Sequence, residues 1–240
     1  MNERLLRLYS QYWEGMIQNI YKANIKDHPS AYPILIQATQ HYQEASRRIM
    51  FCGQETLSWG TNEFPNPDTT TPNDLMSIYN AFVNRNNDGG PIKRPGYYIK
   101  SQKPNLSPYW NFQWNIMQHY PECGFVAQNI VKIGKRNGKG CDDIIYELTK
   151  EFFPVWKQEL EILQPDCILF LTGLYDQRIR EIAGDFDIVP IDGTEGLVAE
   201  LKFKDFSMPK AYRTNHPGLL QRKGKYSLVT NAIKDILKNT

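Results

Sequence analysis

The stretch that decides the fold is RIMFCGQETLSWG, residues 48–60. It opens with an apolar run, residues 49–52, which stops at Gly53, and polar side chains follow at once, among them Gln54 and Glu55. A short, continuous apolar run that ends at a glycine is typical of a strand covered on both faces of a parallel sheet. The stretch therefore predicts a buried strand over residues 47–52 that delivers a carboxylate to the end of a sheet.

The same pattern of apolar runs and helical periodicity recurs along the chain. Further strands are predicted at 124–131, 166–171, 186–191, 197–203 and 210–214. Helices are predicted at 3–24, 33–46, 71–84, 109–119, 142–163 (which Pro154 should kink or divide), 175–182 and 226–237. Because strands and helices alternate, we expect a three-layer α/β/α fold around a central, mainly parallel sheet.

Length and composition set the scale of the protein. Its 240 residues and 41% hydrophobic content suit one domain, residues 1–240, with a helical extension over residues 1–46. The net charge of +2 gives no global attraction to polyanions, so a nucleic-acid surface would have to be a local patch. No window approaches a membrane span and the charged N-terminus has no apolar core of signal-peptide length, so we expect no membrane partner and a cytoplasmic location.

The four cysteines give little sign of a metal centre. Cys52, Cys123, Cys141 and Cys167 form no CxxC pair, and no histidine lies at zinc-finger spacing. Cys52 and Cys167 fall in apolar runs and are predicted to be buried thiols. We therefore predict no metal and no cofactor; an iron–sulfur cluster from four scattered cysteines is the weaker alternative.

Polar side chains follow the predicted strands at the ends where ligands bind in open parallel sheets. Glu55, Asn129 and His216 stand at three such ends, and Gly173 with Tyr175 follows a fourth. An asparagine can donate and accept at once, an imidazole can stabilise an oxyanion, and a carboxylate can orient water or stabilise a cation. Together they suit a nitrogenous ring that carries adjacent carbonyl and N–H groups.

Three short motifs resemble the uracil-DNA glycosylase superfamily, in that family's order. Residues 53–58 (GQETLS) are similar to its Gly-Gln-Asp-Pro-Tyr-His, residues 125–131 (FVAQNIV) to its strand that ends before an Asn, and residues 216–220 (HPGLL) to its His-Pro-Ser-Pro-Leu, before a basic-Gly-aromatic stretch and a last helix. The resemblance covers about residues 47–238 in topology. The run Gly-Gln-Glu-Thr before Trp-Gly also resembles superfamily-like proteins of unestablished function.

The resemblance implies a glycosylase fold and roles for individual residues. Glu55 would position water or stabilise the sugar cation, Asn129 would bind the edge of a flipped base, and His216 would hold the charge on the departing base. The backbone of Gln54 would lie against the base. By the same likeness Leu220 falls where an apolar wedge enters the duplex, Phe64 is the candidate stacking aromatic by nearness in sequence, and no metal is needed.

Two features qualify these roles. Glu55 stands where the family has Asp, and about 1 Å of misplacement can cost two orders of magnitude in rate. Leu57 stands where the family has the Tyr that excludes thymine. Structural roles are the alternatives for two of these residues: Glu55 as a helix cap and Asn129 as a turn residue. The aromatic residues of 109–119 are expected to pack as core, with stacking on bases as the alternative.

Two basic clusters flank the predicted site and could contact phosphates, although basic loops are usually just solvated. Their members include Lys132, Lys135, Arg222 and Lys223. The leading hypothesis is a DNA glycosylase that acts in base-excision repair by hydrolysing the N-glycosidic bond of uracil or another altered base in single- or double-stranded DNA. The alternatives are a non-catalytic module that binds nucleobases or nucleic acid, and a hydrolase of a free nucleoside. The sequence leaves base specificity and oligomeric state open.

Overall fold

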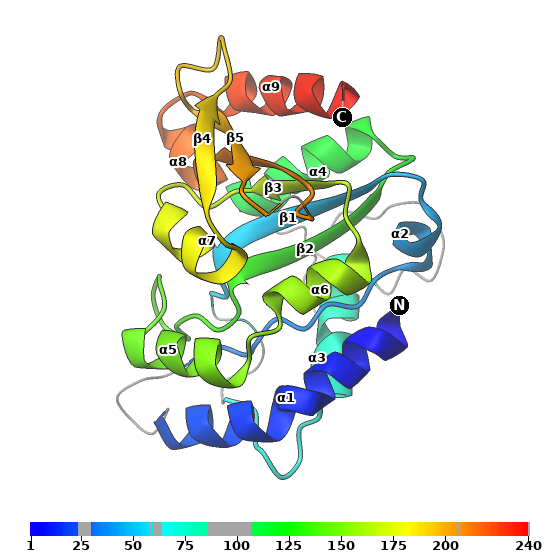
Figure 1. The fold of residues 1–240 in the computed structure, drawn as a ribbon, viewed down its shortest axis with the longest axis vertical. Coiled ribbons are helices and arrows are strands. Elements are labelled where there is room, and N and C mark those ends of the chain that lie inside the picture. Colours follow the sequence, from blue (N-terminus) through cyan, green and yellow to red (C-terminus); the bar gives the residue numbers. More distant parts are fainter. Residues whose placement is uncertain (24–29, 58, 60–63, 86–106, 206, 240) are drawn as a thin grey trace.

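A six-stranded sheet lies at the centre of the molecule (Figure 1). The computed structural model describes residues 1–23, 30–57, 59, 64–85, 107–205 and 207–239. The strand order is β2-β1-β3-β6-β5-β4. The strands are β1 (Arg48–Glu55), β2 (Gly124–Val131), β3 (Cys167–Phe170), β4 (Phe186–Pro190), β5 (Val198–Phe203) and β6 (Lys210–Thr214).

Four neighbouring strands of this sheet run parallel. β1 pairs in parallel with β2 on one side and with β3 on the other, and β3 pairs in parallel with β6. β5 is antiparallel to β6, and β4 is antiparallel to β5. The apolar run Ile49–Cys52 is buried, as expected for an inner strand covered on both faces. The α/β class with a mostly parallel sheet flanked by helices is confirmed.

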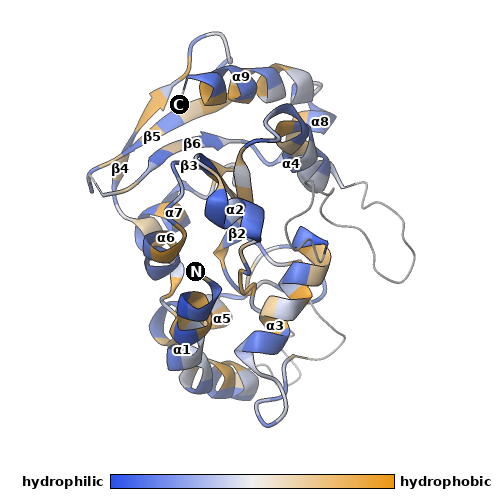
Figure 2. Ribbon diagram, turned by 90° about the vertical axis from the view of Figure 1, so that its right-hand side faces the viewer, coloured by the Kyte–Doolittle hydropathy of each residue, from blue (hydrophilic) through white to orange (hydrophobic). Residues whose placement is uncertain are grey.

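Helices cover both faces of the sheet. In Figure 2, α9 lies above β5 and β6, and α6 and α7 lie below. Three helices form one group: α4 (Pro108–His119), α8 (Pro217–Arg222) and α9 (Tyr226–Lys238). Within this group α4 contacts both α8 and α9. The other helices are α1 (Asn2–Ala23), α2 (Gln40–Glu44), α3 (Pro72–Tyr79) with the π-helical turn η1 (Asn80–Asn84), α5 (Asp143–Phe152), α6 (Trp156–Leu163) and α7 (Asp176–Ala183).

Local signals placed several helix boundaries correctly. Pro154 separates α5 from α6, because proline lacks the N–H group that a continuous helix needs. Thr71 caps α3 by accepting a hydrogen bond from the backbone of Asp74, and the Asp74 carboxylate accepts one from the backbone of Thr71. The buried state of Cys52 and Cys167 is also confirmed.

The helix predicted over residues 33–46 is wrong, because only α2 is helical there. The preceding segment is extended, and its backbone binds to other parts of the fold: the Ile34 N–H donates to the carbonyl of Lys132 (3.2 Å), and the Ile36 N–H donates to the Tyr9 hydroxyl (3.0 Å). Ile34, Leu35 and Ile36 are all buried, which suits an extended segment covered on both sides. Tertiary partners therefore replace the helical hydrogen bonds that the apolar spacing predicted.

Helix α1 packs its apolar side against α3, α5 and α6, as the amphipathic pattern predicted for residues 3–24. Its buried residues include Leu5, Tyr9 and Ile20. None of the helices in the described ranges is both long enough and apolar enough to cross a membrane.

A buried ion pair ties α1 and α6 to the end of β2. The Lys132 ammonium donates to Glu159 Oε1 (2.7 Å) and to Gln128 Oε1 (3.1 Å), and the Tyr9 hydroxyl donates to the same Glu159 oxygen (2.7 Å). Lys132 and Glu159 are 3% and 0% exposed. Burial raises the pKa of Glu159, and the Lys132 charge opposes that rise. The structure therefore contradicts the prediction that Lys132 contacts phosphate.

This ion pair gives a stability prediction. Lys132→Met leaves a buried carboxylate without its cation, so we expect a loss of about 3–5 kcal/mol in the free energy of unfolding. Lys132→Met combined with Glu159→Gln removes both charges and keeps an acceptor for Tyr9, so it should recover most of that loss. Urea unfolding followed by tryptophan fluorescence measures both. Equal losses in the single and double variants would contradict this account.

Candidate functional site

The centre of the candidate site is Gly53 on β1, which lies opposite Asn129 on β2 in the parallel register. A Cβ atom on residue 53 would overlap Asn129 Oδ1 and would lie 2.6 Å from the Tyr109 hydroxyl. Real Cβ atoms do not approach other heavy atoms so closely. The glycine is therefore required here by close approach, and it lets an amide and a phenol meet above the end of β1.

Asn129 supplies the amide from within a fully buried strand. It is 8% exposed, and every residue of β2 is buried. Its side-chain amide forms no hydrogen bond with any residue in the described ranges. Because a buried amide normally has partners, this group is available to donate to and accept from a ligand.

Tyr109 links Asn129 to the histidine of the third motif. It lies in the first turn of α4, where Ser107 is the N-cap and Pro108 the first residue. Its ring is parallel to the His216 ring, with an interplanar angle of 9° and centroids 5.9 Å apart. Burial raises the pKa of Tyr109, so its hydroxyl is protonated at neutral pH. Asn129, Tyr109 and His216 therefore form one contiguous group.

His216 is held as the N-cap of α8. Its Nδ1 accepts a hydrogen bond from the Gly218 backbone N–H at 3.1 Å. In a neutral imidazole the nitrogen that accepts carries no proton, so the proton resides on Nε2. Within the described part of the chain, no residue hydrogen-bonds to Nε2. The fold thus presents a histidine tautomer that can donate to a ligand.

The surroundings of His216 favour its neutral form. Burial is the main cause that lowers the pKa of His216 below its ordinary value, and the charge of Glu55 partly opposes this effect. The cations of Lys139 and Arg222 lower the pKa further. A lowered pKa means that His216 is a neutral hydrogen-bond donor at neutral pH, and that it gains charge only as the pH falls into the acidic range.

Glu55, the carboxylate at the end of β1, has both oxygens engaged. The Tyr175 hydroxyl donates to Oε2 (2.6 Å), and the Gly140 backbone N–H donates to Oε1 (2.8 Å). Tyr175 lies in the turn after β3, and Gly140 lies in the loop after β2. The carboxylate is therefore fastened to the two loops beside β1, and its charge acts on His216.

Gln54 and the turn after β3 complete this end of the sheet. The Gln54 side-chain amide donates to the carbonyl of Thr172 (2.8 Å). Gly173 has φ = +62°, a left-handed conformation that favours glycine, and a Cβ there would lie 3.6 Å from the His216 backbone nitrogen. Gln54 therefore fixes the β3 turn beside His216 with its side chain.

Two predicted contacts are contradicted by burial. Leu220 is 0% exposed and belongs to the core, so it cannot enter a duplex as a wedge. Phe64 is 6% exposed and also packs in the core, which leaves little of its ring free to stack on a base. Both predictions rested on sequence position alone, and both are wrong because the two side chains pack in the hydrophobic core.

The remaining predicted cations lie at the surface. Arg222 and Lys223 are exposed at the end of α8, and Lys135 is partly exposed in the loop after β2. Arg222 lies close enough to affect His216, as does the exposed Lys139. Arg222 and Lys139 are therefore accessible to an anionic ligand beside His216.

Sequence reasoning missed Tyr109 and the role of Tyr175. The aromatic residues of 109–119 were expected to pack as core, and Tyr175 was noted only for its place after a strand. The helix predicted over residues 109–119 matches α4 to within one residue, but no sequence signal indicated that its first turn would lie against His216.

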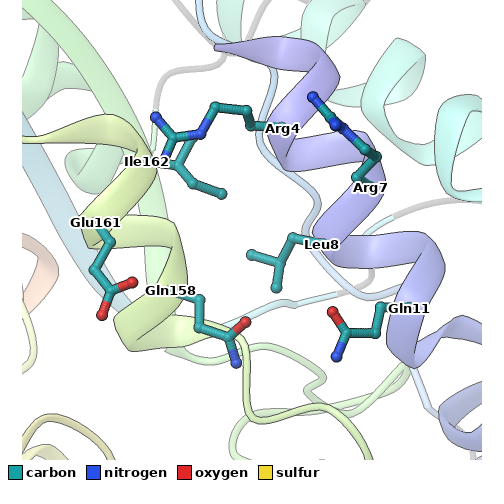
Figure 3. A pocket seen from close by; sticks show the side chains of 7 residues that line it. All are labelled: Arg4, Arg7, Leu8, Gln11, Gln158, Glu161 and Ile162. Atoms are coloured by element: carbon teal, nitrogen blue, oxygen red, sulfur yellow. The ribbon is translucent and has the colours of Figure 1, made fainter.

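A surface hollow of about 420 Å³ lies elsewhere, between α1 and α6. Figure 3 shows the side chains that line it: Arg4, Arg7, Leu8, Gln11, Gln158, Glu161 and Ile162. None of them belongs to the site around Gly53, so we assign the hollow no role in it. No group of three or more His, Cys, Asp or Glu in the described ranges is placed to hold a metal ion.

Comparison with known proteins found no family model and no curated protein that matches this chain. The resemblance to the uracil-DNA glycosylase superfamily therefore rests on the three motifs alone. What the geometry adds is the position of their polar residues at one end of the sheet.

The site gives a prediction at its centre. Gly53→Ala should cost about 1–3 kcal/mol in the free energy of unfolding, because the added methyl group overlaps Asn129 and Tyr109. The matched control is Gly15→Ala on the exposed side of α1, where the added Cβ meets Phe152 at 3.8 Å, an ordinary contact. It should leave stability unchanged or raise it by up to about 1 kcal/mol. Urea unfolding that shows Gly53→Ala as stable as the parent would refute the close approach.

Proposed function

We propose that the protein hydrolyses an N-glycosidic bond and releases a nucleobase. The single observation that carries this proposal is the contiguous group of Asn129, Tyr109 and His216. The Asn129 amide lies near the hydroxyl of Tyr109 and the His216 ring stacks on the Tyr109 ring, while neither the amide nor the His216 Nε2–H is hydrogen-bonded by any described residue. A planar ring with adjacent carbonyl and N–H groups matches these donors and acceptors.

Recognition of the base falls to Asn129 and Tyr109. The Asn129 amide can donate to a carbonyl and accept from an adjacent N–H of the same ring. Its burial makes the choice selective, because a base that lacks the matching groups would leave the amide unsatisfied. Tyr109 supplies an aromatic face and a protonated hydroxyl beside it.

Release of the base falls to His216. As the bond breaks, its electron pair leaves with the base and negative charge develops on the base carbonyl oxygen. A neutral imidazole that donates from Nε2 stabilises this charge without transferring a proton. Water bonds to the sugar carbon, one proton of the water ends on the base nitrogen, and the products are the free base and the sugar hydroxyl.

Glu55 supplies negative charge where the sugar becomes cation-like, as carboxylates do in other glycoside hydrolysis. Each of its oxygens accepts one hydrogen bond and retains a second lone pair for water. A polymeric substrate is favoured by the exposed cations near His216, because Arg222 and Lys139 would meet phosphates on either side of the extruded nucleotide.

Two observations favour a second function, binding of a nucleobase or nucleic acid without cleavage. Both oxygens of Glu55 already accept hydrogen bonds from the protein, as in a purely structural carboxylate. The burial of Leu220 also favours binding without cleavage, because the site then lacks the predicted wedge. In that case the site would bind the base through its amide and imidazole donors and would not cleave the N-glycosidic bond.

The test uses single- and double-stranded oligonucleotides that carry one uracil, hypoxanthine, xanthine or mismatch, followed by alkali and a denaturing gel. We expect the parent protein to give alkali-labile sites with at least one of these bases. Glu55→Gln and His216→Ala should each lower the rate by about 100-fold or more, because each removes one charge-stabilising group from the transition state.

Matched controls are Glu151→Gln and His119→Ala, two exposed residues of the same types outside the site, which should retain the parent rate. Full activity in both site variants would exclude this mechanism. Strand binding by the parent protein without any abasic product would establish the binding module instead.

A further inference from the structure

We propose that Tyr175 is a positioning residue that holds the Glu55 carboxylate for the reaction. This inference rests on the proposed function and adds a residue that the motifs do not contain. Its basis is the 2.6 Å hydrogen bond from the Tyr175 hydroxyl to Glu55 Oε2, across from the bond that the Gly140 N–H donates to Oε1.

The two hydrogen bonds fix the plane of the carboxylate. They come from different loops, one after β3 and one after β2, and each binds a different oxygen. A carboxylate held at both oxygens cannot rotate about its last bond without losing a partner. The lone pairs that remain on each oxygen therefore have fixed directions.

Tyr175 is itself held in place by a cation. The Arg178 guanidinium lies over the Tyr175 ring, 5.1 Å from its centroid, and over the Tyr146 ring at 4.5 Å. Burial and the neighbouring Glu55 raise the pKa of Tyr175, so its hydroxyl remains a donor at neutral pH. Arg178 on α7 thus orients the tyrosine, and the tyrosine orients the carboxylate.

This arrangement explains why residue 55 is a glutamate. An aspartate would draw the carboxylate back by about one carbon–carbon bond, roughly 1.5 Å. A hydrogen bond of 2.6 Å cannot stretch by that amount and persist. The longer side chain is therefore the one that reaches both Tyr175 and Gly140.

Tyr146 provides a matched control within the same cluster. Its hydroxyl donates to Glu181 Oε2 at 2.6 Å, and the same Arg178 covers its ring. Tyr146→Phe therefore removes an equivalent tyrosine–carboxylate hydrogen bond that does not reach Glu55. An effect of Tyr175→Phe that Tyr146→Phe lacks is therefore not a general effect of losing a tyrosine–carboxylate hydrogen bond beside Arg178.

The experiment measures kcat and KM for base release with the substrate that the oligonucleotide panel identifies. Tyr175→Phe keeps the ring and its contact with Arg178, so we expect an unchanged fold and a KM within about twofold. Its kcat should fall by about 10- to 100-fold, because the freed carboxylate leaves its reacting position. Tyr146→Phe should keep the parent kcat. Adding Tyr175→Phe to Glu55→Gln should cause little further loss, since both act through one carboxylate.

A second readout does not depend on activity. With tyrosine labelled at the ring carbon that bears the hydroxyl, the NMR signal of Tyr175 should move in Glu55→Gln, whereas that of Tyr146 should not. An unmoved Tyr175 signal would overturn the inference, as would parent kcat in Tyr175→Phe or equal losses in both tyrosine variants. If the parent protein releases no base from any substrate, the proposed function fails first and the positioning role fails with it.

Discussion

The parallel register that sets Gly53 opposite Asn129 is the constraint on which the rest of this site depends. β1 pairs with β2 from Arg48 opposite Gly124 to Glu55 opposite Val131, so the whole ladder holds this register. Side chains alternate between the two faces of a strand, and a slip of one residue would turn the Asn129 amide to the opposite face. The glycine then leaves room for that amide and for Tyr109 at one point.

The residue directly after β2 anchors the N-terminal helix. Three residues beyond Asn129, Lys132 forms the buried ion pair with Glu159 that Tyr9 completes. The end of β2 therefore carries Asn129, the proposed recognition residue, and is followed directly by Lys132, which holds the fold together. This explains why a lysine in a basic stretch is buried in the core while its neighbours in sequence, Lys135 and Lys139, remain accessible.

The sequence alone predicts those features of the fold that depend on local pattern. Apolar runs such as Ile49–Cys52 gave the buried strands, Pro154 divided a helix, and strand ends located Glu55, Asn129 and His216. Prediction from the sequence failed where contacts distant in the sequence determine the conformation. The residues before α2 are extended because α1 and the loop after β2 supply their hydrogen bonds. The role of Tyr109 was missed for the same reason, since only the packing of α4 brings it to the motifs, and the hydrogen bond from Tyr175 to Glu55 could not be predicted from its place after a strand.

The most direct test of the central claim, that Asn129 and His216 serve one nucleobase, is an NMR titration with free bases. Uracil, hypoxanthine and thymine would each be added to protein labelled with nitrogen-15. The account predicts that one of them shifts the Asn129 side-chain amide and the His216 Nε2 signal with a common midpoint, and leaves His119 unmoved. Responses at different midpoints, or of one group alone with every base, would contradict it.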